Sequence, residues 1–384
     1  MRLLIVSHTP HYRSNGTLVG WGPTIREIDH LARLFADVVH VAPVHDDVPP
    51  PSAMPYAASN VVVREVSPAG GERLSDKLAV VRRTPEYVSV LRKEMEYADV
   101  IHVRCPANIA LIALIMLGAM RTPARRWAKY AGNWAPDRHE PLSYRFQRWW
   151  LRRGLHRGVV TVNGEWPDQP RHVHSFLNPC LTDEEREQAR LVAVRKRLVE
   201  PLRLLFVGRL EEEKGVGRCI AALQAIVSDG INAGLDVVGD GPERAEFERR
   251  ANELELGSRV RFHGWLPRSV LGELYACAHH VVLPSTSSEG WPKVLSEGMA
   301  YGAVPITSTV SSIPQLLERF RTGKVLPATD VGAIAGAIVG YLRAPDAWSR
   351  DSANAVEAAN YFTYSAHIRA VRQLLELDAP IDKQ

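Results

Sequence analysis

Two glutamates at an expected strand-to-helix transition are the residues whose spacing first suggests chemistry. Glu289 lies in a polar loop after a short apolar strand, and Glu297 lies eight positions later, in the second turn of an expected helix. That helix should begin near Lys293, so the backbone N–H groups of Lys293 and Val294 have no partner within it and suit a phosphate. A carboxylate one turn further can accept hydrogen bonds from ribose hydroxyls, and the loop carboxylate can reach a sugar beyond the phosphates.

Two cations follow another expected strand, Leu202 to Val207. Arg209 comes directly after this strand, and Lys214 precedes the next expected helix. Two cations in a strand-end loop suit a diphosphate, because they oppose its charge when it departs as a leaving group. Taken alone, such a pair is more often ordinary surface charge.

The sequence predicts two successive series of alternating strands and helices, and these elements must position the candidate residues. A chain of 384 residues has room for two domains of ordinary size. We expect an α/β protein with two doubly wound units in tandem. The expected boundaries are residues 1–180 for the first domain, 181–200 for a linker, 201–360 for the second domain and 361–384 for a final helix.

The expected first domain offers fewer candidate residues. After its first strand comes a glycine-rich segment with Asn15 and Gly16, which we interpret as a loop that is not a GxGxxG fingerprint. Its glycines either allow close approach of the backbone to a ligand or only shape the turn. Arg104 ends the expected strand 100–103, where an arginine could bind a phosphate or an acidic group bidentately or form a structural ion pair.

Charge is unevenly divided along the chain. Residues 1–175 hold 23 Lys and Arg against 16 Asp and Glu, a balance of +7, whereas the whole chain is +4. This basic half suits an anionic membrane surface, a phosphate-bearing acceptor or nucleic acid. Nucleic acid is the least favoured of these partners, because no recognition motif is visible.

The segment 142–158 combines aromatic and basic residues. Leu142, Phe146 and two tryptophans fall roughly on one helical face, and arginines that include Arg148 fall on another. One interpretation is a helix that lies in a membrane interface. The other is an amphipathic helix packed on its own domain, with a solvated basic face.

The remaining composition indicates a cytoplasmic protein. Four cysteines stand far apart and form neither a metal-ligand spacing nor a disulfide framework. We expect the first residues to form a buried strand rather than a signal peptide. The longest apolar run, 109–120, is shorter than the roughly 20 residues that span a bilayer.

The stretch EGWPKVLSEGMAYGAVPI, which begins at Glu289, resembles the donor-site signature EGFPxVLLEAMAxGxPV of glycosyltransferase family 4. The segment LLFVGRLEEEKGV is similar to the GRLxxxKG motif of the same family, and the turns at 239–242 and 264–267 are similar to its VxGxGP and VxFxGxL turns. The resemblance implies the GT-B fold, in which two tandem Rossmann-like doubly wound domains face a central cleft. It also implies that the final helix packs back on the N-terminal domain.

The resemblance further implies a retaining, metal-independent, hexosyltransferase-like enzyme. Such an enzyme moves a sugar from a UDP- or GDP-sugar to an acceptor hydroxyl, here in bacterial polysaccharide or glycolipid assembly. Arg209 and Lys214 would hold the diphosphate, Glu297 the ribose and Glu289 the donor sugar. No cofactor and no metal are expected, since no Asp-x-Asp motif stands at a strand end.

Other site residues follow from the same resemblance. The first turn includes Gly241, and backbone groups at Trp265 and Leu266 in the second would read the base. Asn15 and Gly16 would touch the acceptor or a donor phosphate. Many family members carry a His-x-His pair where this chain has His102-Val103-Arg104, so the role of that second histidine does not transfer to Arg104.

Two alternatives remain open at this point. A sugar-phosphate synthase of the same fold would need a basic phosphate-binding cluster, for which Arg13, Arg104 and Arg138 are candidates. A non-catalytic GT-B subunit could instead act as a scaffold. The expected partners are a nucleotide-sugar donor and a carbohydrate or lipid-linked acceptor, with membrane contact through 142–158 at the cytoplasmic face of the inner membrane.

Overall fold

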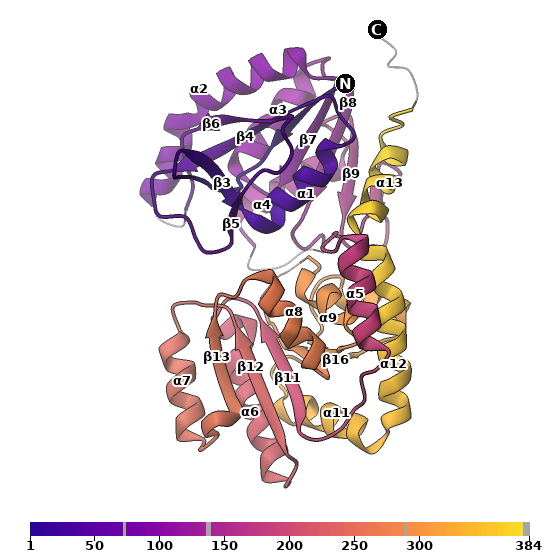
Figure 1. The fold of residues 1–384 in the computed structure, drawn as a ribbon. Helices are drawn as coiled ribbons and strands as arrows, with labels where there is room; N and C mark the ends of the chain where they lie inside the picture. The colour runs from indigo at the N-terminus through magenta and orange to yellow at the C-terminus, as the bar shows by residue number, and fades with distance from the viewer. Residues whose placement is uncertain (72–73, 136–139, 288–289, 379–384) are drawn as a thin grey trace. The chain divides into compact units, whose positions relative to one another are not determined.

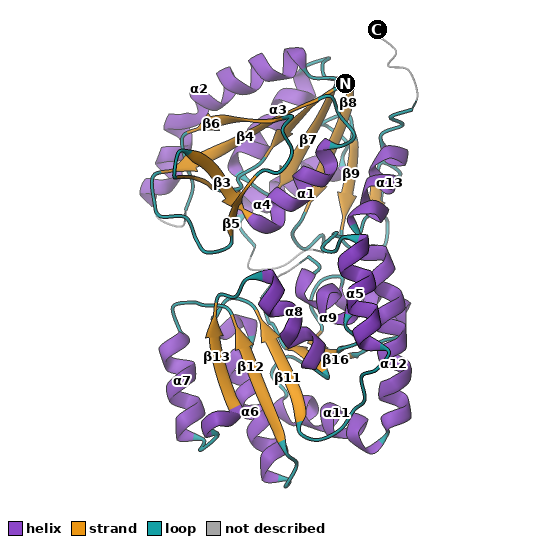
Figure 2. Ribbon diagram, in the orientation of Figure 1, coloured by secondary structure: helices purple, strands orange, loops and turns teal. Residues whose placement is uncertain are grey.

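The computed structural model describes residues 1–71, 74–135, 140–287 and 290–378. The chain divides into two compact units (Figure 1). Unit 1 comprises Met1–Leu177 and His367–Gln384, and unit 2 comprises Asn178–Ala366. Each unit is built on its own sheet, with helices packed against it (Figure 2).

Unit 1 contains a sheet with strand order β10-β9-β8-β7-β1-β4-β2-β3-β5, and β6 pairs with β4 as well. Its inner strands are parallel and apolar, as the continuous apolar runs of the sequence predict. The strands are β1 (Arg2–Val6), β2 (His11–Ser14), β3 (Thr17–Trp21), β4 (Asp37–His45), β5 (Ala53–Pro55), β6 (Val61–Val66), β7 (Val100–Cys105), β8 (Arg125–Tyr130), β9 (Val159–Val162) and β10 (Val173–Ser175).

Helices of unit 1 bury two apolar clusters of the sheet. One cluster joins β1, β4 and β7 to α2 and α3. The other joins β1 to α1, to α13 through Val371, and to Leu375, which follows α13 directly. The helices are α1 (Gly22–Ala32), α2 (Leu74–Tyr97), α3 (Asn108–Ala119), α4 (Leu142–Arg152) and α13 (Tyr364–Leu374).

The segment after β1 is a β-hairpin, so its interpretation as a glycine-rich loop was wrong. β2 and β3 pair antiparallel, and Ser14 faces Thr17 across the turn. Asn15 and Gly16 are the two turn residues, with φ of 48° and 76°. Positive φ at both central residues is typical of the type I′ hairpin turn, which favours the Asn-Gly pair.

Helix α4 differs from the interpretation of an amphipathic helix that packs on its domain and exposes a basic face, because it exposes aromatic side chains and buries an arginine. Leu142 is 78% exposed, Phe146 40% and Trp149 47%, whereas Arg148 is buried. The Arg148 guanidinium donates to both carboxylate oxygens of Glu140, at 2.6 and 2.5 Å. The ion pair compensates the buried charge. Leu151 is buried in the core, whereas Leu142, Phe146 and Trp149 face solvent.

Unit 2 contains a fully parallel sheet with strand order β13-β12-β11-β14-β15-β16. Numbered within the unit, this is the order 3-2-1-4-5-6 of a doubly wound Rossmann fold, so the expected fold class is confirmed. The strands are β11 (Leu202–Val207), β12 (Ala233–Val238), β13 (Val260–Gly264), β14 (His280–Leu283), β15 (Val304–Ser308) and β16 (Lys324–Leu326).

The helices of unit 2 connect these strands and cover the sheet (Figure 1). They are α5 (Asp183–Ala193), α6 (Val216–Ser228), α7 (Arg244–Glu253), α8 (Arg268–Cys277), α9 (Lys293–Ala300), α10 (Ile313–Phe320), α11 (Val331–Arg343) and α12 (Pro345–Ala358), with 3₁₀ turns η1 (Glu212–Lys214), η2 (Gly257–Arg259) and η3 (Ala359–Phe362). The segment 181–200 contains α5, which packs against α8 and α9.

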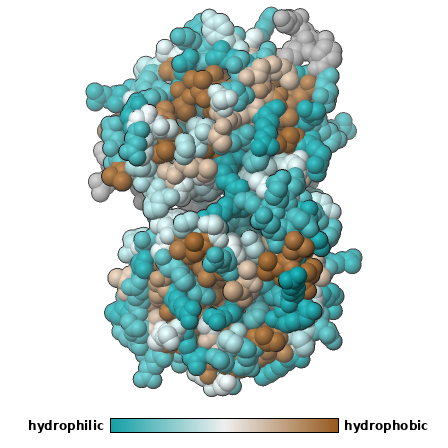
Figure 3. Space-filling view, viewed as in Figure 1, coloured by the Kyte–Doolittle hydropathy of each residue, from teal (hydrophilic) through white to brown (hydrophobic). Residues whose placement is uncertain are grey.

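The visible surface is mostly hydrophilic, and hydrophobic side chains form separate small clusters on it (Figure 3). Within the described part of the chain, no helix is long and apolar enough to cross a membrane.

Candidate functional site

Two loops meet at the point where the strand order of unit 2 reverses. β11 and β14 are neighbours, and the chain leaves them for opposite directions in the sheet. In open α/β sheets, ligands bind outside the carboxyl ends of the strands at such a switch point. The loops are joined by a backbone hydrogen bond from Thr286 to the Glu213 carbonyl, 2.8 Å, and by Lys214 Nζ, which donates to Ser287 Oγ at 2.9 Å.

The two predicted cations lie on the loop that follows β11. Lys214 ends the 3₁₀ turn η1, directly before α6. The Arg209 side chain is 64% exposed and forms an ion pair with Glu211 at 2.6 Å. An exposed pair of this kind contributes little to stability, so an anionic ligand could replace Glu211 as the partner of Arg209 at small cost.

Helix α9 begins at Lys293, as the sequence predicts. No side chain within the described residues caps its amino end, where Pro292 is the N-cap residue. Trp291 anchors the chain just before this end, because its indole donates to Ser296 Oγ at 2.6 Å and its ring stacks on Phe362. These contacts of Trp291 therefore fix the backbone position of the first turn of α9, which contains the N–H groups of Lys293 and Val294.

The Glu297 carboxylate is buried in the second turn of α9 and receives two donors from α8. Arg268 Nη1 donates to one oxygen at 2.6 Å, and the Tyr275 hydroxyl donates to the other at 3.1 Å. Each carboxylate oxygen can accept more than one hydrogen bond, so the group keeps acceptor capacity. Burial raises the pKa of Tyr275, and the charge of Glu297 raises it further, so the phenol remains a donor.

Arg268 also connects Glu297 to helix α5. Its guanidinium donates to Glu185 at 2.8 and 3.2 Å and to the Cys180 carbonyl at 2.7 Å. Burial alone would lower the pKa of Arg268, but the charges of Glu297 and Glu185 outweigh it and raise that pKa. Arg268 therefore stays charged and fixes the orientation of the Glu297 carboxylate.

The turns after β12 and β13 complete this edge of the sheet. The Gly239 N–H donates to the Gly264 carbonyl at 2.8 Å, and Leu210 N–H donates to the Asp240 carbonyl at 3.0 Å. Gly241 lies against the Leu210 backbone, since a Cβ there would come within 2.4 Å of the carbonyl oxygen. This contact explains why position 241 is a glycine, and the explanation does not depend on any ligand.

The base-reading residues of the prediction lie on the loop between β13 and α8. Trp265 is 44% exposed and Leu266 is half-buried. Only Pro267, the N-cap residue of α8, separates them from Arg268, so the loop that would read the base leads into the helix whose side chains hold Glu297.

The predicted site residues of unit 1 belong to a different sheet from those of unit 2 and are described separately. The Arg104 guanidinium donates to Glu27 at 2.7 Å, and Lys129 donates to the same oxygen at 2.7 Å. Arg104 therefore forms the ion pair that the sequence left open as an alternative, and a ligand role for it stays a prediction. Asn15 and Gly16 are exposed at the hairpin turn. Glu289 lies outside the described residues.

Within the described residues, no group of three or more His, Cys, Asp or Glu side chains could hold a metal ion. The prediction of a metal-independent reaction stays a prediction, as does that of a reaction without a cofactor.

Residues 190–359 match the family model of glycosyl transferases group 1. This match spans the unit 2 candidates, namely Arg209, Lys214, Gly241, Trp265, Leu266, Lys293, Val294 and Glu297. It begins well after Arg104 and the hairpin turn of unit 1, so it does not include them.

Among characterised relatives, the chain is 31% identical over 189 residues to the amylovoran biosynthesis glycosyltransferase AmsK of Erwinia amylovora, covering 48% of this chain and 46% of that protein. It is 29% identical over 209 residues to the alpha-D-kanosaminyltransferase of Streptomyces kanamyceticus, covering 53% and 54%. The chain thus spans about half the length of these relatives.

Solved structures resemble the whole chain. A sucrose-phosphate synthase from Thermosynechococcus elongatus superposes with a TM-score of 0.71 at 20% identity, covering 98% of each chain. Anabaena Alr3699/HepE, in complex with UDP and glucose, has a TM-score of 0.66 at 17% identity, covering 97% and 99%. At these identities the likeness shows the fold alone, which is the GT-B fold of two Rossmann-like domains.

Sequence reasoning missed Arg268 and Tyr275, the two residues that hold Glu297. Neither belongs to the motifs that carry the resemblance, and Arg268 reads as one more charged residue at the start of a helix. The position of Arg268 in the sequence was a usable signal. Because Arg268 follows the expected base-reading loop directly, it must lie at the same edge of the sheet.

Proposed function

We propose that the protein is a retaining glycosyltransferase that moves a sugar from a UDP- or GDP-sugar to an acceptor hydroxyl. The observation that carries this proposal is the meeting of the Arg209–Lys214 loop, the amino end of α9 and Glu297 at the switch point of unit 2. Support comes from the family match of residues 190–359 and from relatives named as glycosyltransferases.

In this mechanism the cations Arg209 and Lys214 face the donor diphosphate. The bond between the sugar and the diphosphate breaks while the bond to the acceptor oxygen forms on the same face of the ring. The departing phosphate takes the acceptor proton, and the two cations with the first-turn N–H groups of α9 stabilise its charge. Glu297 accepts the ribose hydroxyls, and Glu289 is proposed to hydrogen-bond the donor sugar. No metal takes part.

The setting we propose is bacterial polysaccharide or glycolipid assembly. AmsK is named for amylovoran biosynthesis, and another relative, from Salmonella typhimurium, is named as a putative colanic acid biosynthesis glycosyltransferase. The acceptor would then be a carbohydrate or a lipid-linked saccharide.

The sugar-phosphate synthase alternative receives less support from the unit 1 contacts. Of the cluster that it would need, Arg13 is paired with Glu65 and Arg104 with Glu27. Arg138 lies outside the described residues. A phosphate-bearing acceptor would have to replace these carboxylates before the arginines could bind it.

Nucleotide binding is the first test of the proposal. We would screen UDP, GDP, ADP and their sugar conjugates by thermal unfolding in EDTA, for the wild type, Lys214→Met, Glu297→Gln and a surface control, Arg195→Gln. A ligand at a hundred times its Kd adds about 2.7 kcal/mol, which corresponds to a shift of about 5 to 10 °C for a unit of this size. The shift is measured against each variant's own ligand-free midpoint, because Glu297 also has structural partners.

We expect one base to raise the midpoint in the wild type and in Arg195→Gln, and not in the two site variants. Transfer to an acceptor with the same conjugate, followed by NMR of the anomeric proton, tests retention. No shift with any nucleotide would move the scaffold alternative to the front, and a product of inverted configuration would remove the retaining mechanism.

We also propose that helix α4 contacts an anionic lipid surface, at the cytoplasmic face of the membrane. Its exposed apolar residues are Leu142, Tyr144, Phe146 and Trp149, and exposed arginines at 145, 152 and 153 flank them. Aromatic rings suit the membrane interface, and arginines complement anionic headgroups.

Vesicle co-sedimentation tests this contact. We expect binding to vesicles with 30% phosphatidylglycerol and little binding to neutral ones, and at least a fivefold loss in Phe146→Ser/Trp149→Ser. The control Leu78→Ser/Val81→Ser removes two equally exposed apolar side chains from α2 and should bind as the wild type does. Equal binding of both double variants would show that α4 is not the contact.

A further inference from the structure

One face of the sheet in unit 2 is polar at the amino ends of three adjacent strands. At these ends of β11, β12 and β13, Leu204, Leu235 and Val260 are buried on one face. The opposite face carries Arg203 on β11 and Arg261 on β13, and it becomes apolar further along β11, where Leu205 is buried. Polar side chains that alternate with buried ones in this way mark a part of a sheet face that is open to solvent.

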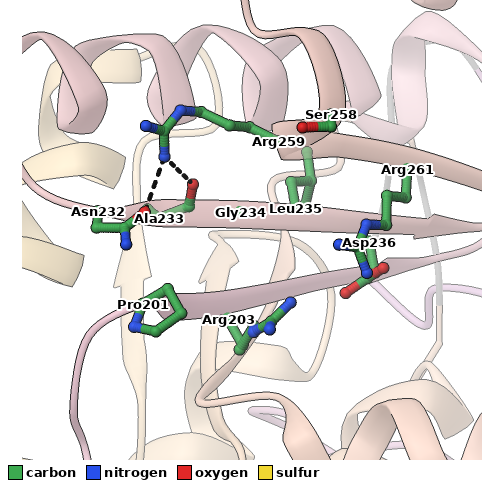
Figure 4. A pocket seen from close by; sticks show the side chains of 10 residues that line it. All are labelled: Pro201, Arg203, Asn232, Ala233, Gly234, Leu235, Asp236, Ser258, Arg259 and Arg261. Carbon is green, nitrogen blue, oxygen red and sulfur yellow. Dashed lines mark hydrogen bonds between the residues drawn. The ribbon is translucent and has the colours of Figure 1, made fainter.

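This polar face forms a pocket of about 300 Å³. Its lining is shown in Figure 4 and consists of Pro201, Arg203, Asn232, Ala233, Gly234, Leu235, Asp236, Ser258, Arg259 and Arg261. The volume lies at the lower end of the range for small-molecule sites.

Three guanidinium groups contribute to the pocket. Arg259 is fixed, since its Nη1 donates to Asn232 Oδ1 at 2.9 Å and to the Ala233 carbonyl at 3.2 Å (Figure 4). Arg203 and Arg261 reach in from opposite sides, toward Asp236 (Figure 4). In the described part of the chain, neither of these two guanidiniums has an ion pair or a side-chain hydrogen bond.

The pocket therefore carries an excess of positive charge. Asp236 is the one carboxylate in its lining, and one oxygen of that carboxylate is bonded to His263 Nε2 at 2.7 Å. Gly234 leaves the floor without a side chain, and a Cβ there would approach only the Arg259 carbonyl, at 3.3 Å. A ligand could thus approach the strand backbone between the arginines.

The pocket is distinct from the candidate donor site. Arg203, Gly234 and Arg261 are each the second residue of their strands, whereas Arg209 follows the carboxyl end of β11. Six residues of extended chain, at about 3.3 Å per residue, put Arg203 about 20 Å from Arg209. One small ligand cannot occupy both places.

We propose that this pocket is a second anion site, which binds a small ligand through a phosphate or diphosphate group. Planar guanidiniums bind two oxygens of such a group at once. Two of them approach here from β11 and β13, the strands on either side of β12, and neither is paired with a carboxylate of the described residues. The inference does not depend on the proposed glycosyltransferase reaction.

Pyrophosphate is the probe for the test, and calorimetric titration is the measurement. Because the donor site also attracts phosphates, all proteins carry Arg209→Gln/Lys214→Gln as a common background. The pocket variant adds Arg203→Gln/Arg261→Gln. A matched control adds Arg195→Gln/Arg343→Gln, which removes the same charge from two exposed arginines elsewhere in unit 2. Thermal unfolding without ligand checks that each protein is folded.

We expect the background protein and the matched control to bind pyrophosphate with the same Kd, and the pocket variant to bind at least tenfold more weakly. Equal binding by the pocket variant and the control would overturn the proposal, as would no measurable binding by the background protein. Failure of the proposed function would appear separately, in the nucleotide screen with Arg203 and Arg261 intact.

Discussion

A partly buried lysine fixes the carboxyl end of α8, the helix whose side chains hold Glu297, and the charge state of this lysine can be tested by changing the pH. Lys196 Nζ donates to the carbonyls of Tyr275 and Ala278, at 2.9 and 2.7 Å, at the end of α8. A cation is favoured at a helix carboxyl end, where carbonyls lack partners within the helix. Burial opposes the charge and lowers the pKa of Lys196 to about 7.

The sign of the effect follows from proton counting. The unfolded chain keeps Lys196 protonated up to a pKa of about 10.4, whereas the folded chain releases the proton near 7. Between these values the unfolded state binds more protons, so folding becomes more favourable as pH rises. The slope approaches about 1.4 kcal/mol per pH unit, which amounts to about 2 kcal/mol between pH 7.5 and 9.5.

Buried thiols act in the opposite direction over the same interval. Burial raises the pKa of Cys105, Cys180 and Cys219, while the same thiols ionise near pH 8.5 in the unfolded chain. Their contribution to stability is therefore lost as pH rises. The wild-type curve alone mixes both effects, and the difference from a Lys196→Met variant isolates the lysine.

Urea unfolding of both proteins at pH 7.5, 8.5 and 9.5 measures this difference. We expect the free energy of unfolding of the wild type to rise by about 2 kcal/mol relative to that of Lys196→Met between pH 7.5 and 9.5. The hydrogen bonds that the variant loses add a constant difference between the two proteins. Curves that stay parallel within about 0.5 kcal/mol would refute the reasoning. Helix capping would then outweigh desolvation, and Lys196 would be charged in the folded protein.

Three further substitutions test the contacts of the two units. Arg268→Met should cost about 2 kcal/mol in urea unfolding and weaken nucleotide binding, because Glu297 loses its cation in a partly exposed site. Gly241→Ala should cost about 2 kcal/mol, since a Cβ meets the Leu210 backbone; an unchanged midpoint would contradict that packing. Glu27→Gln leaves two buried cations without their carboxylate and should cost about 3 kcal/mol, measured in the same way.

The edge of unit 2 could be predicted from the sequence because local signals decide it. Short apolar runs predict buried parallel strands, and the proline before Lys293 marks the start of α9. Once the strands and helices alternate, handedness and strand order bring the loops after β11 and β14 together. Local pattern and general topology were therefore sufficient to place Glu297 in the second turn of α9.

The partners of Glu297 could not be predicted in the same way. Arg268 lies 29 residues before Glu297 in the chain and 83 residues after Glu185, which it also binds. Which of many charged residues comes within hydrogen-bond distance of Glu297 depends on how α5, α8 and α9 pack. By contrast, the hairpin at Asn15 and Gly16 had a local signal, since Asn-Gly between strand-like segments predicts a type I′ turn, and that signal was overlooked.

Helix α4 shows what periodicity leaves open. The spacing of Leu142, Phe146 and Trp149 correctly groups them on one helical face, but periodicity does not say whether that face points to the core or to solvent. In this helix Leu151 is buried together with two polar side chains. These are Gln147, whose amide oxygen accepts from the Ala107 N–H at 3.1 Å, and Arg148, which is paired with Glu140. A buried arginine is tolerated when its charge is paired, so the polar side of a helix can pack inward. Several apolar side chains are then exposed to solvent, and vesicle binding is the measurement that tests whether they contact a lipid surface.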